Sequence, residues 1–300
     1  MKAGSDKLLV PGFLMPGDTI GIVAPSSPFD MENFRRGVAV LEDMGFHVHA
    51  PEGLFKKSAY LAGSDSHRAR MVNLLFSNAK IKGIVCARGG FGAMRILSLL
   101  NYEIIIKNPK FFIGFSDISA ILSALYTRCG LITFHGPMVS SLGRATQRTK
   151  DALRSALLGD KKIEIRLKSG VTIQSGATRG PVIGGNLTTL VHLMGTPFMP
   201  SFKGHILFLE DRGEAAYRID RMLTQMKMAG CFDGILGLAL GYFNARNRMH
   251  EIFKIVAHVF TGLNIPILAG FDVGHGRTNL TLPLGLPAAL DADAHVLQYS

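Results

Sequence analysis

A serine at a strand-to-helix junction is the first residue in this sequence whose placement suits chemistry. The stretch "KFFIGF" (110–115) predicts a buried strand, and "DISAILSALYTRCG" (117–130) predicts a helix. Ser116 lies between them, where a hydroxyl projects above the carboxyl end of a parallel strand and the following N–H groups face a developing oxyanion. The nucleophile-elbow pattern G-x-S-x-G is incomplete, because Ile118 replaces its second glycine.

A helix cap explains the same residues without any chemistry. Serine is a favoured N-cap residue, and the carboxylate of Asp117 suits the positive end of a helix. Taken alone, the octet "IGFSDISA" therefore favours a capping role for Ser116 over a catalytic one.

A catalytic serine requires a base, and His275 stands out among the ten histidines. In "DVGHGRTN" it lies between two glycines, in a loop whose backbone is free to present the imidazole. His135, in "TFHGP" at the end of a predicted strand, is the alternative base.

The carboxylate that orients such a histidine must be held rigidly. Glu210 ends the apolar strand "HILFLE" and meets that requirement. Asp211 and Glu214 fit better as caps of the helix expected near 216–229. Together with His275 these carboxylates also suggest a metal, but they lack a spacing of the HExxH type. We therefore expect no metal.

Two glycine-rich stretches follow predicted strands. "CARGGFGAMR" has neither the lysine of a P-loop nor the third glycine of a dinucleotide-binding fingerprint. A backbone N–H of Gly89 or Gly90 suits an oxyanion instead, and the Arg88 guanidinium suits a substrate carboxylate. In "IGGNLTTL", Asn186 is placed to cap a helix or to contact substrate, and the cap is the simpler interpretation.

Composition restricts the class of protein. The net charge is +11, but the densest basic stretch, 143–170, has no aromatic residues interleaved for base stacking, which favours a solvated face over nucleic-acid binding. A small anionic substrate is compatible with the same positive field.

No apolar stretch approaches the roughly 20 residues of a membrane span, and prolines and glycines interrupt the first 18 residues. Three widely spaced cysteines form no disulfide pattern, so we expect a cytoplasmic protein without membrane or nucleic-acid partners.

Strands and helices alternate through the first half of the chain, which predicts an α/β fold with a parallel sheet. The strands are expected at 19–24, 46–50, 83–87, 110–115 and 131–134, and the helices at 31–45, 65–78, 92–100, 117–130 and 147–160. The pattern then becomes mixed. We expect an α/β domain over 1–160, a linker over 161–178, and a smaller, β-rich domain over 179–300.

Eight stretches, in this order and spacing, resemble the LD-carboxypeptidases. These are serine peptidases that remove a terminal D-amino acid from murein tetrapeptides, and the microcin-immunity peptidases are their relatives. The stretches are "PGDTIGIVAPSSP", "YLAGSDSHRARMVNLL", "ARGGFGAMRIL", "GFSDISAIL", "TFHGPM", "GGNLTTLVHLMGTPFMP", "ILFLEDRGEAAYRIDRML" and "GHGRTNLTLPLG". Phe91, Phe115 and Ser119 depart from the residues common in the family.

The resemblance implies a site between an α/β domain and a β-rich domain. It implies a triad of Ser116, Glu210 and His275, with the backbone N–H groups of Gly90 and Asp117 as the oxyanion hole. It also implies a homodimer and a reaction that needs no metal or organic cofactor.

The expected function is hydrolysis of the L,D-peptide bond before a terminal D-residue, usually D-alanine of a murein tetrapeptide, during cell-wall recycling. The substrate is then a small peptide with a free D-amino-acid carboxylate. Two alternatives are a peptidase that cleaves a microcin-like peptide–nucleotide conjugate and a small-molecule binding protein without turnover.

Overall fold

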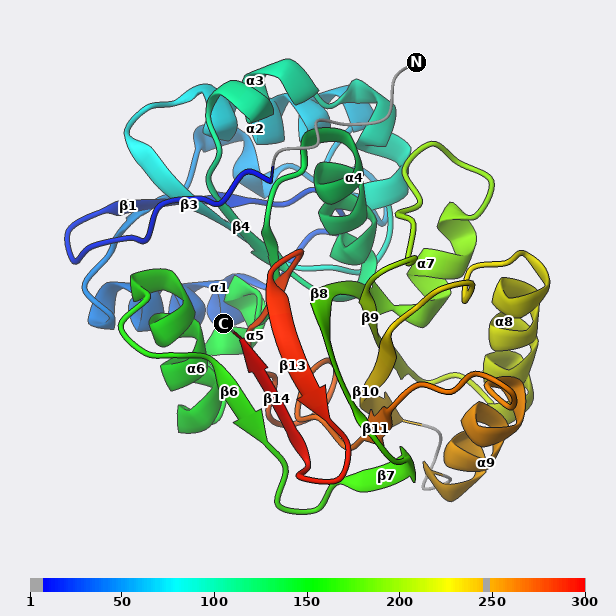
Figure 1. The fold of residues 1–300 in the computed structure, drawn as a ribbon. Coiled ribbons are helices and arrows are strands. Elements are labelled where there is room, and N and C mark those ends of the chain that lie inside the picture. The colour runs from blue at the N-terminus through cyan, green and yellow to red at the C-terminus, as the bar shows by residue number, and fades with distance from the viewer. Residues whose placement is uncertain (1–7, 245–248, 300) are drawn as a thin grey trace.

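Two sheets organise the chain in the computed structural model, which describes residues 8–244 and 249–299 (Figure 1). The first sheet has six strands in the order β12-β5-β4-β3-β1-β2. The bounds are β1 (Thr19–Val23), β2 (His47–His49), β3 (Ile81–Cys86), β4 (Phe111–Gly114), β5 (Thr133–His135) and β12 (Leu282–Leu284). All its strands are parallel except β12, which runs antiparallel to β5.

Helices cover both faces of the first sheet, as the alternating pattern predicts. Figure 1 shows α2 and α3 above the sheet and α1, α5 and α6 below it. The bounds are α1 (Met31–Asp43), α2 (Asp65–Ser77), α3 (Tyr102–Lys107), α4 (Ser119–Cys129), α5 (Val139–Leu142) and α6 (Gln147–Leu158), with 3₁₀ helices η1 (Glu52–Phe55), η2 (Ala93–Leu99) and η3 (Ser116–Ile118). The strands β3 and β4 are almost entirely buried because helices lie over both of their faces.

The second sheet has eight strands in the order β6-β14-β13-β8-β9-β10-β11-β7. Its bounds are β6 (Glu164–Arg166), β7 (Val171–Gln174), β8 (Ala177–Asn186), β9 (Ile206–Arg212), β10 (Gly237–Asn244), β11 (Ile267–Ala269), β13 (Pro287–Asp291) and β14 (Val296–Tyr299). The strands β8 to β11 are parallel, and the others pair antiparallel at both sides. Its helices are α7 (Leu187–Leu193), α8 (Ala216–Met228) and α9 (Met249–Val259). The predicted α/β fold, with a parallel N-terminal sheet and a β-rich C-terminal part, is confirmed.

The structure differs from the expected division of the chain in two places. Residues 161–178, expected as a linker, contribute β6 and β7 to the second sheet. Ile165 in β6 and Leu167 directly after it are buried in the core. Near the C-terminus, β12 returns to the first sheet beside β5, so the chain crosses between the two sheets three times.

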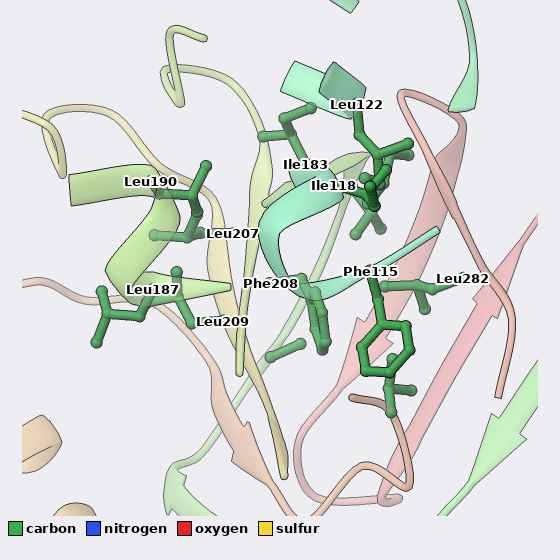
Figure 2. Packing of buried hydrophobic residues seen from close by; sticks show 14 of the residues in the cluster. Phe115, Ile118, Leu122, Ile183, Leu187, Leu190, Leu207, Phe208, Leu209 and Leu282 are labelled. Carbon is green, nitrogen blue, oxygen red and sulfur yellow. The ribbon is translucent and has the colours of Figure 1, made fainter. Parts of the chain in front are cut away.

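A continuous apolar core joins the two sheets. Helix α4 is buried on nearly every face, because it lies between the sheets rather than against one of them. Figure 2 shows this seam. Its labelled residues are Phe115, Ile118, Leu122, Ile183, Leu187, Leu190, Leu207, Phe208, Leu209 and Leu282. Among the described residues, no helix combines the length and apolar character needed to cross a membrane.

The close contact between α1 and α5 predicts that one added methyl group at Gly37 lowers the stability of the fold. An added Cβ at Gly37 would lie 1.8 Å from the carbonyl oxygen of Val139. We expect Gly37→Ala to lower the free energy of unfolding by about 1–3 kcal/mol, because the backbone must move. Denaturant unfolding measures this. Gly12→Ala is the control, since no atom lies within 4 Å of its added Cβ, and equal stability of the two variants would contradict the packing described.

Candidate active site

Ser116 occupies a strained turn between β4 and α4. Its φ angle is +64°, one of three positive values among the described non-glycine residues. Such a conformation costs on the order of 1–3 kcal/mol and persists only where its surroundings impose it. Here the buried strand β4 precedes the turn, and the buried helix α4 follows it.

The Ser116 hydroxyl does not cap a helix, in contrast to the simplest interpretation of its octet. The residues at the cap positions of η3 and α4 are Phe115 and Ile118, and neither makes a side-chain cap bond. The side-chain hydrogen bond of Ser116 within the described part of the chain is with Nε2 of His275, at 3.1 Å.

His275 joins Ser116 to Glu210. Its Nδ1 lies 2.6 Å from Glu210 Oε2. Because an ionised carboxylate only accepts, Nδ1–H donates to it, and Nε2 is left to accept from the serine hydroxyl. Gly274 makes this approach possible, since an added Cβ there would lie 2.4 Å from the same carboxylate oxygen.

Glu210 is a fully buried carboxylate on β9, opposite Asn186 of β8. Burial, the largest influence, raises its pKa, but the neighbouring imidazoles of His135 and His275 lower the pKa by more. The resulting pKa is about 2, against an ordinary value of 4.5. Glu210 is therefore ionised wherever the protein is folded near neutral pH, and its charge is available to an imidazolium.

Asn186 connects this carboxylate to both halves of the chain. Its Oδ1 accepts from the Thr189 backbone N–H at 3.0 Å, which is the expected helix cap of α7. Its Nδ2 donates to Glu210 Oε1 at 3.2 Å and to Asp211 Oδ1 at 3.3 Å. Its backbone N–H donates to Ser119 Oγ, one turn after Ser116. The site is thus held across the seam by hydrogen bonds as well as by apolar packing.

A cavity of about 520 Å³ opens over these groups. It brings together Ser116, His275, Asn186, Gly90 and Asp117 of the predicted site residues. The remaining lining residues are Phe91, Gly92, Met94, Arg95, Thr188, Thr189, His192, Asp211, Arg212 and Glu214.

The two predicted oxyanion donors lie on segments that are tied to each other. The carboxylate of Asp117 accepts from the Ala93 backbone N–H at 2.9 Å. The Phe91 N–H donates to Ser27 Oγ at 3.1 Å, which fixes the loop beside Gly90. The N–H of Gly90 has no acceptor among the residues that the structure describes, so it is free for a ligand.

Arg88 does not line the cavity, contrary to its expected role as a substrate clamp. Its side chain is directed elsewhere, because Nη1 donates to the Pro28 carbonyl at 2.8 Å. Two other arginines line the cavity instead. Arg95 lines the cavity and pairs with Asp65 at 2.8 Å, and Arg212 lines it without an ion pair to any described residue.

The alternative base, His135, lies at the same site. It is fully buried, and its Nε2 is 3.9 Å from Glu210 Oε1. The sequence carried a signal for this, because β4 and β5 are consecutive parallel strands that end at the same edge of the sheet. In the two ranges described, no group of three or more His, Cys, Asp or Glu side chains is arranged to hold a metal ion.

Family comparison covers both halves of this site. The profile of the LD-carboxypeptidase N-terminal domain matches residues 20–136, and that of the C-terminal domain matches residues 179–290. The chain belongs to the LD-carboxypeptidase family. It is thereby a member of a peptidase family.

Relatives of this LD-carboxypeptidase family member match over nearly their whole length. A Streptomyces coelicolor protein assigned as a carboxypeptidase is 37% identical, over 97% of this chain and 96% of its own. The microcin C7 self-immunity protein MccF of Escherichia coli is 32% identical, over 93% and 92%. The murein tetrapeptide carboxypeptidase of Pseudomonas aeruginosa is 28% identical, over 91% and 93%. Among solved structures, an MccF-like protein of Bacillus anthracis matches with a TM-score of 0.92 and 29% identity, over 97% of this chain and 99% of its own.

The strained turn predicts a difference between two variants of the serine. Ser116→Gly removes both the hydroxyl and the Cβ, whereas Ser116→Ala removes the hydroxyl alone. We expect the glycine variant to have a free energy of unfolding about 1 kcal/mol higher than the alanine variant, because a Cβ is disfavoured at this φ angle. Denaturant titration of both variants measures this, and an alanine variant of equal or greater stability would show that the turn is unstrained.

The low pKa of Glu210 predicts a pH dependence of stability. Because folding lowers this pKa from 4.5 to about 2, ionised Glu210 stabilises the folded state above pH 4.5, and the contribution is lost as the pH falls through 2. A shift of this size corresponds to on the order of 3 kcal/mol. We expect the unfolding free energy of the wild type, relative to Glu210→Gln, to fall by about this amount between pH 5 and pH 2. A difference that is constant with pH would contradict the ionised, hydrogen-bonded state.

Proposed function

We propose that this chain is a serine-type LD-carboxypeptidase that hydrolyses the L,D-peptide bond before a terminal D-amino acid. The observation that carries the proposal is the series of contacts from Ser116 Oγ to His275 Nε2, at 3.1 Å, and from His275 Nδ1 to Glu210 Oε2, at 2.6 Å. Ser116 and His275 line a cavity large enough for a peptide end. Hydroxyl, imidazole and carboxylate in this order form an activated nucleophile.

The proposed reaction begins when His275 Nε2 takes the proton of Ser116 and Oγ attacks the carbonyl before the terminal residue. Glu210 holds the imidazole and stabilises its charged form. The backbone N–H groups of Gly90 and Asp117 stabilise the tetrahedral oxyanion, an effect worth about 3 kcal/mol per donor in other enzymes. His275 then protonates the departing amine, and water releases the acyl group from Ser116 with the same base.

The terminal carboxylate of the substrate requires a cation in the cavity. Arg212 fits this role better than Arg88 does, because it lines the cavity and pairs with no described carboxylate, whereas Arg88 donates to the Pro28 carbonyl. A guanidinium can bind a carboxylate through two parallel hydrogen bonds.

The substrate that we propose is a murein tetrapeptide ending in D-alanine, as in cell-wall recycling. The name of the Pseudomonas aeruginosa relative supports it. A cytoplasmic location and a homodimer belong to the same proposal.

A peptide–nucleotide conjugate is the second candidate substrate, supported by the similarity to MccF. One feature of the cavity favours it. The Phe91 side chain is 54% exposed, lines the cavity and packs edge-on against Tyr60 at 5.5 Å. An exposed aromatic ring of this kind can stack on a base. Comparing turnover of such a conjugate with turnover of the tetrapeptide separates the two substrates.

The nucleophile is tested with Ser116→Ala and a tetrapeptide ending in D-alanine, beside its L-alanine twin. We expect the wild type to release D-alanine alone, and Ser116→Ala to lose this activity by a factor of at least about 10³ while it remains folded, since the nucleophile is absent. Chromatography of the products measures the release.

Ser123→Ala is the matched control. Ser123 lies on α4, and its buried hydroxyl has no hydrogen-bond partner in the described part of the chain. Its removal should leave turnover within about threefold, because the hydroxyl contacts nothing polar. Full activity of Ser116→Ala would refute the serine mechanism, and peptide recovered intact from the wild type would refute the substrate.

A further inference from the structure

A second histidine lies beside the carboxylate that faces His275. His135 ends β5, and in the sheet register it pairs with Gly114, two residues before Ser116. Its Nε2 lies 3.9 Å from Glu210 Oε1, whereas Oε2 faces Nδ1 of His275. One buried carboxylate therefore has an imidazole at each of its oxygens.

The surroundings of His135 leave its polar atoms without partners. The side chain is fully buried, and neither ring nitrogen makes a hydrogen bond to any residue in the described ranges. Its ring lies edge-on to Phe115 at 5.8 Å and to Phe208 at 5.1 Å. A buried polar group without a partner destabilises the fold, and an apolar side chain of similar size would avoid this loss. Packing therefore does not account for an imidazole at this position.

The restraint on Glu210 is incomplete without His135. His275 fixes one carboxylate oxygen, and Asn186 is the hydrogen-bond donor at the other. The Asn186 amide has two N–H groups and bonds to two carboxylates, to Glu210 at 3.2 Å and to Asp211 at 3.3 Å, and both bonds are long. A carboxylate held firmly at one oxygen can still rotate about its final torsion.

We propose that His135 is a positioning residue, whose imidazole directs Nε2–H at Glu210 Oε1 and keeps Oε2 facing His275. The inference rests on the proposed serine mechanism. When His275 accepts the serine proton, the carboxylate must carry its full charge in place, and long contacts of a resting site shorten at that stage.

Two substitutions separate positioning from packing. His135→Gln places an amide N–H near the Nε2 position and keeps a donor. His135→Phe keeps a ring between the same two phenylalanines but cannot donate. We expect the phenylalanine variant to lose about 30- to 100-fold in kcat with KM within about threefold, and the glutamine variant to stay within about fivefold of wild type in kcat, because misplacement of a catalytic group acts on the reaction step. The reverse ranking, with phenylalanine active and glutamine impaired, would overturn the proposal.

A readout without turnover tests the same geometry. In proton NMR, the His275 Nδ1–H that bonds to Glu210 should give a low-field resonance, assigned by its loss in Glu210→Gln. We expect this resonance to persist in His135→Gln and to broaden or move upfield in His135→Phe, with His135→Leu as the second apolar variant if phenylalanine prevents folding. An unchanged resonance in the apolar variants would overturn the inference. Ser116→Ala, assayed in parallel, tests the serine mechanism separately. Activity of the Ser116→Ala variant would refute the proposed function, whereas the resonance tests the role of His135 alone.

Discussion

The buried charge of Glu210 is the constraint on which the rest of the structure depends. A carboxylate without solvent is tolerated only when hydrogen bonds replace its water, and removing one partner leaves an uncompensated charge. The partners of Glu210 come from different places: Asn186 from the neighbouring strand and His275 from a loop after β11. The second sheet and this loop must therefore be correctly folded together before the charge is accommodated.

Orientation of the serine toward this carboxylate is a separate requirement, because Ser116 follows β4 of the first sheet. The apolar seam shown in Figure 2 satisfies this requirement, because α4, which follows Ser116, is packed against both halves of the chain. The bond from the Asn186 N–H to Ser119 Oγ adds a directional contact to this apolar packing. A hydrophobic contact tolerates small sliding movements, whereas a hydrogen bond at 3.0 Å fixes the register of α4 against β8. Strain at Ser116 is compatible with this arrangement, since the elements on both sides of the turn cannot relax.

The sequence predicted the local setting of each catalytic candidate, but their meeting followed only from the family resemblance. A strand-to-helix turn at Ser116, a strand end at Glu210 and a glycine-flanked loop at His275 are local features, visible in short windows. Their contact spans sequence separations of 65 and 159 residues, which no local pattern encodes. Short strands at the edge of a sheet also could not be predicted from the local sequence pattern. In β6 the burial alternates over three residues only, too few to distinguish a strand from a linker.

The position of Arg95 at the cavity, where Arg88 was expected, could not be predicted from the local sequence either. Arg88 lies in the loop directly after β3, and Arg95 lies within η2, where a regular helix was expected. A 3₁₀ helix turns by about 120° per residue rather than about 100°, so side chains three and four positions along it face other directions than in an α-helix. Whether Arg95 faces the cavity thus depends on the type of helix, and sequence periodicity distinguishes the two types poorly over seven residues.

The charges of the whole chain and the charges of the cavity act on different stages of substrate binding, the approach of the peptide and its bound orientation. The chain carries a net charge of +11, but the cavity sets Arg95 and Arg212 against three carboxylates, those of Asp117, Asp211 and Glu214. Fields from distant basic residues are screened beyond about 8 Å at physiological ionic strength, so they act on the approach of an anionic peptide rather than on its bound pose. Within the cavity, side chains of opposite charge line the same space and so define a direction. A peptide end, which places its terminal carboxylate at one point and the reacting carbonyl one residue away, is the kind of ligand that such a directional field can align over Ser116.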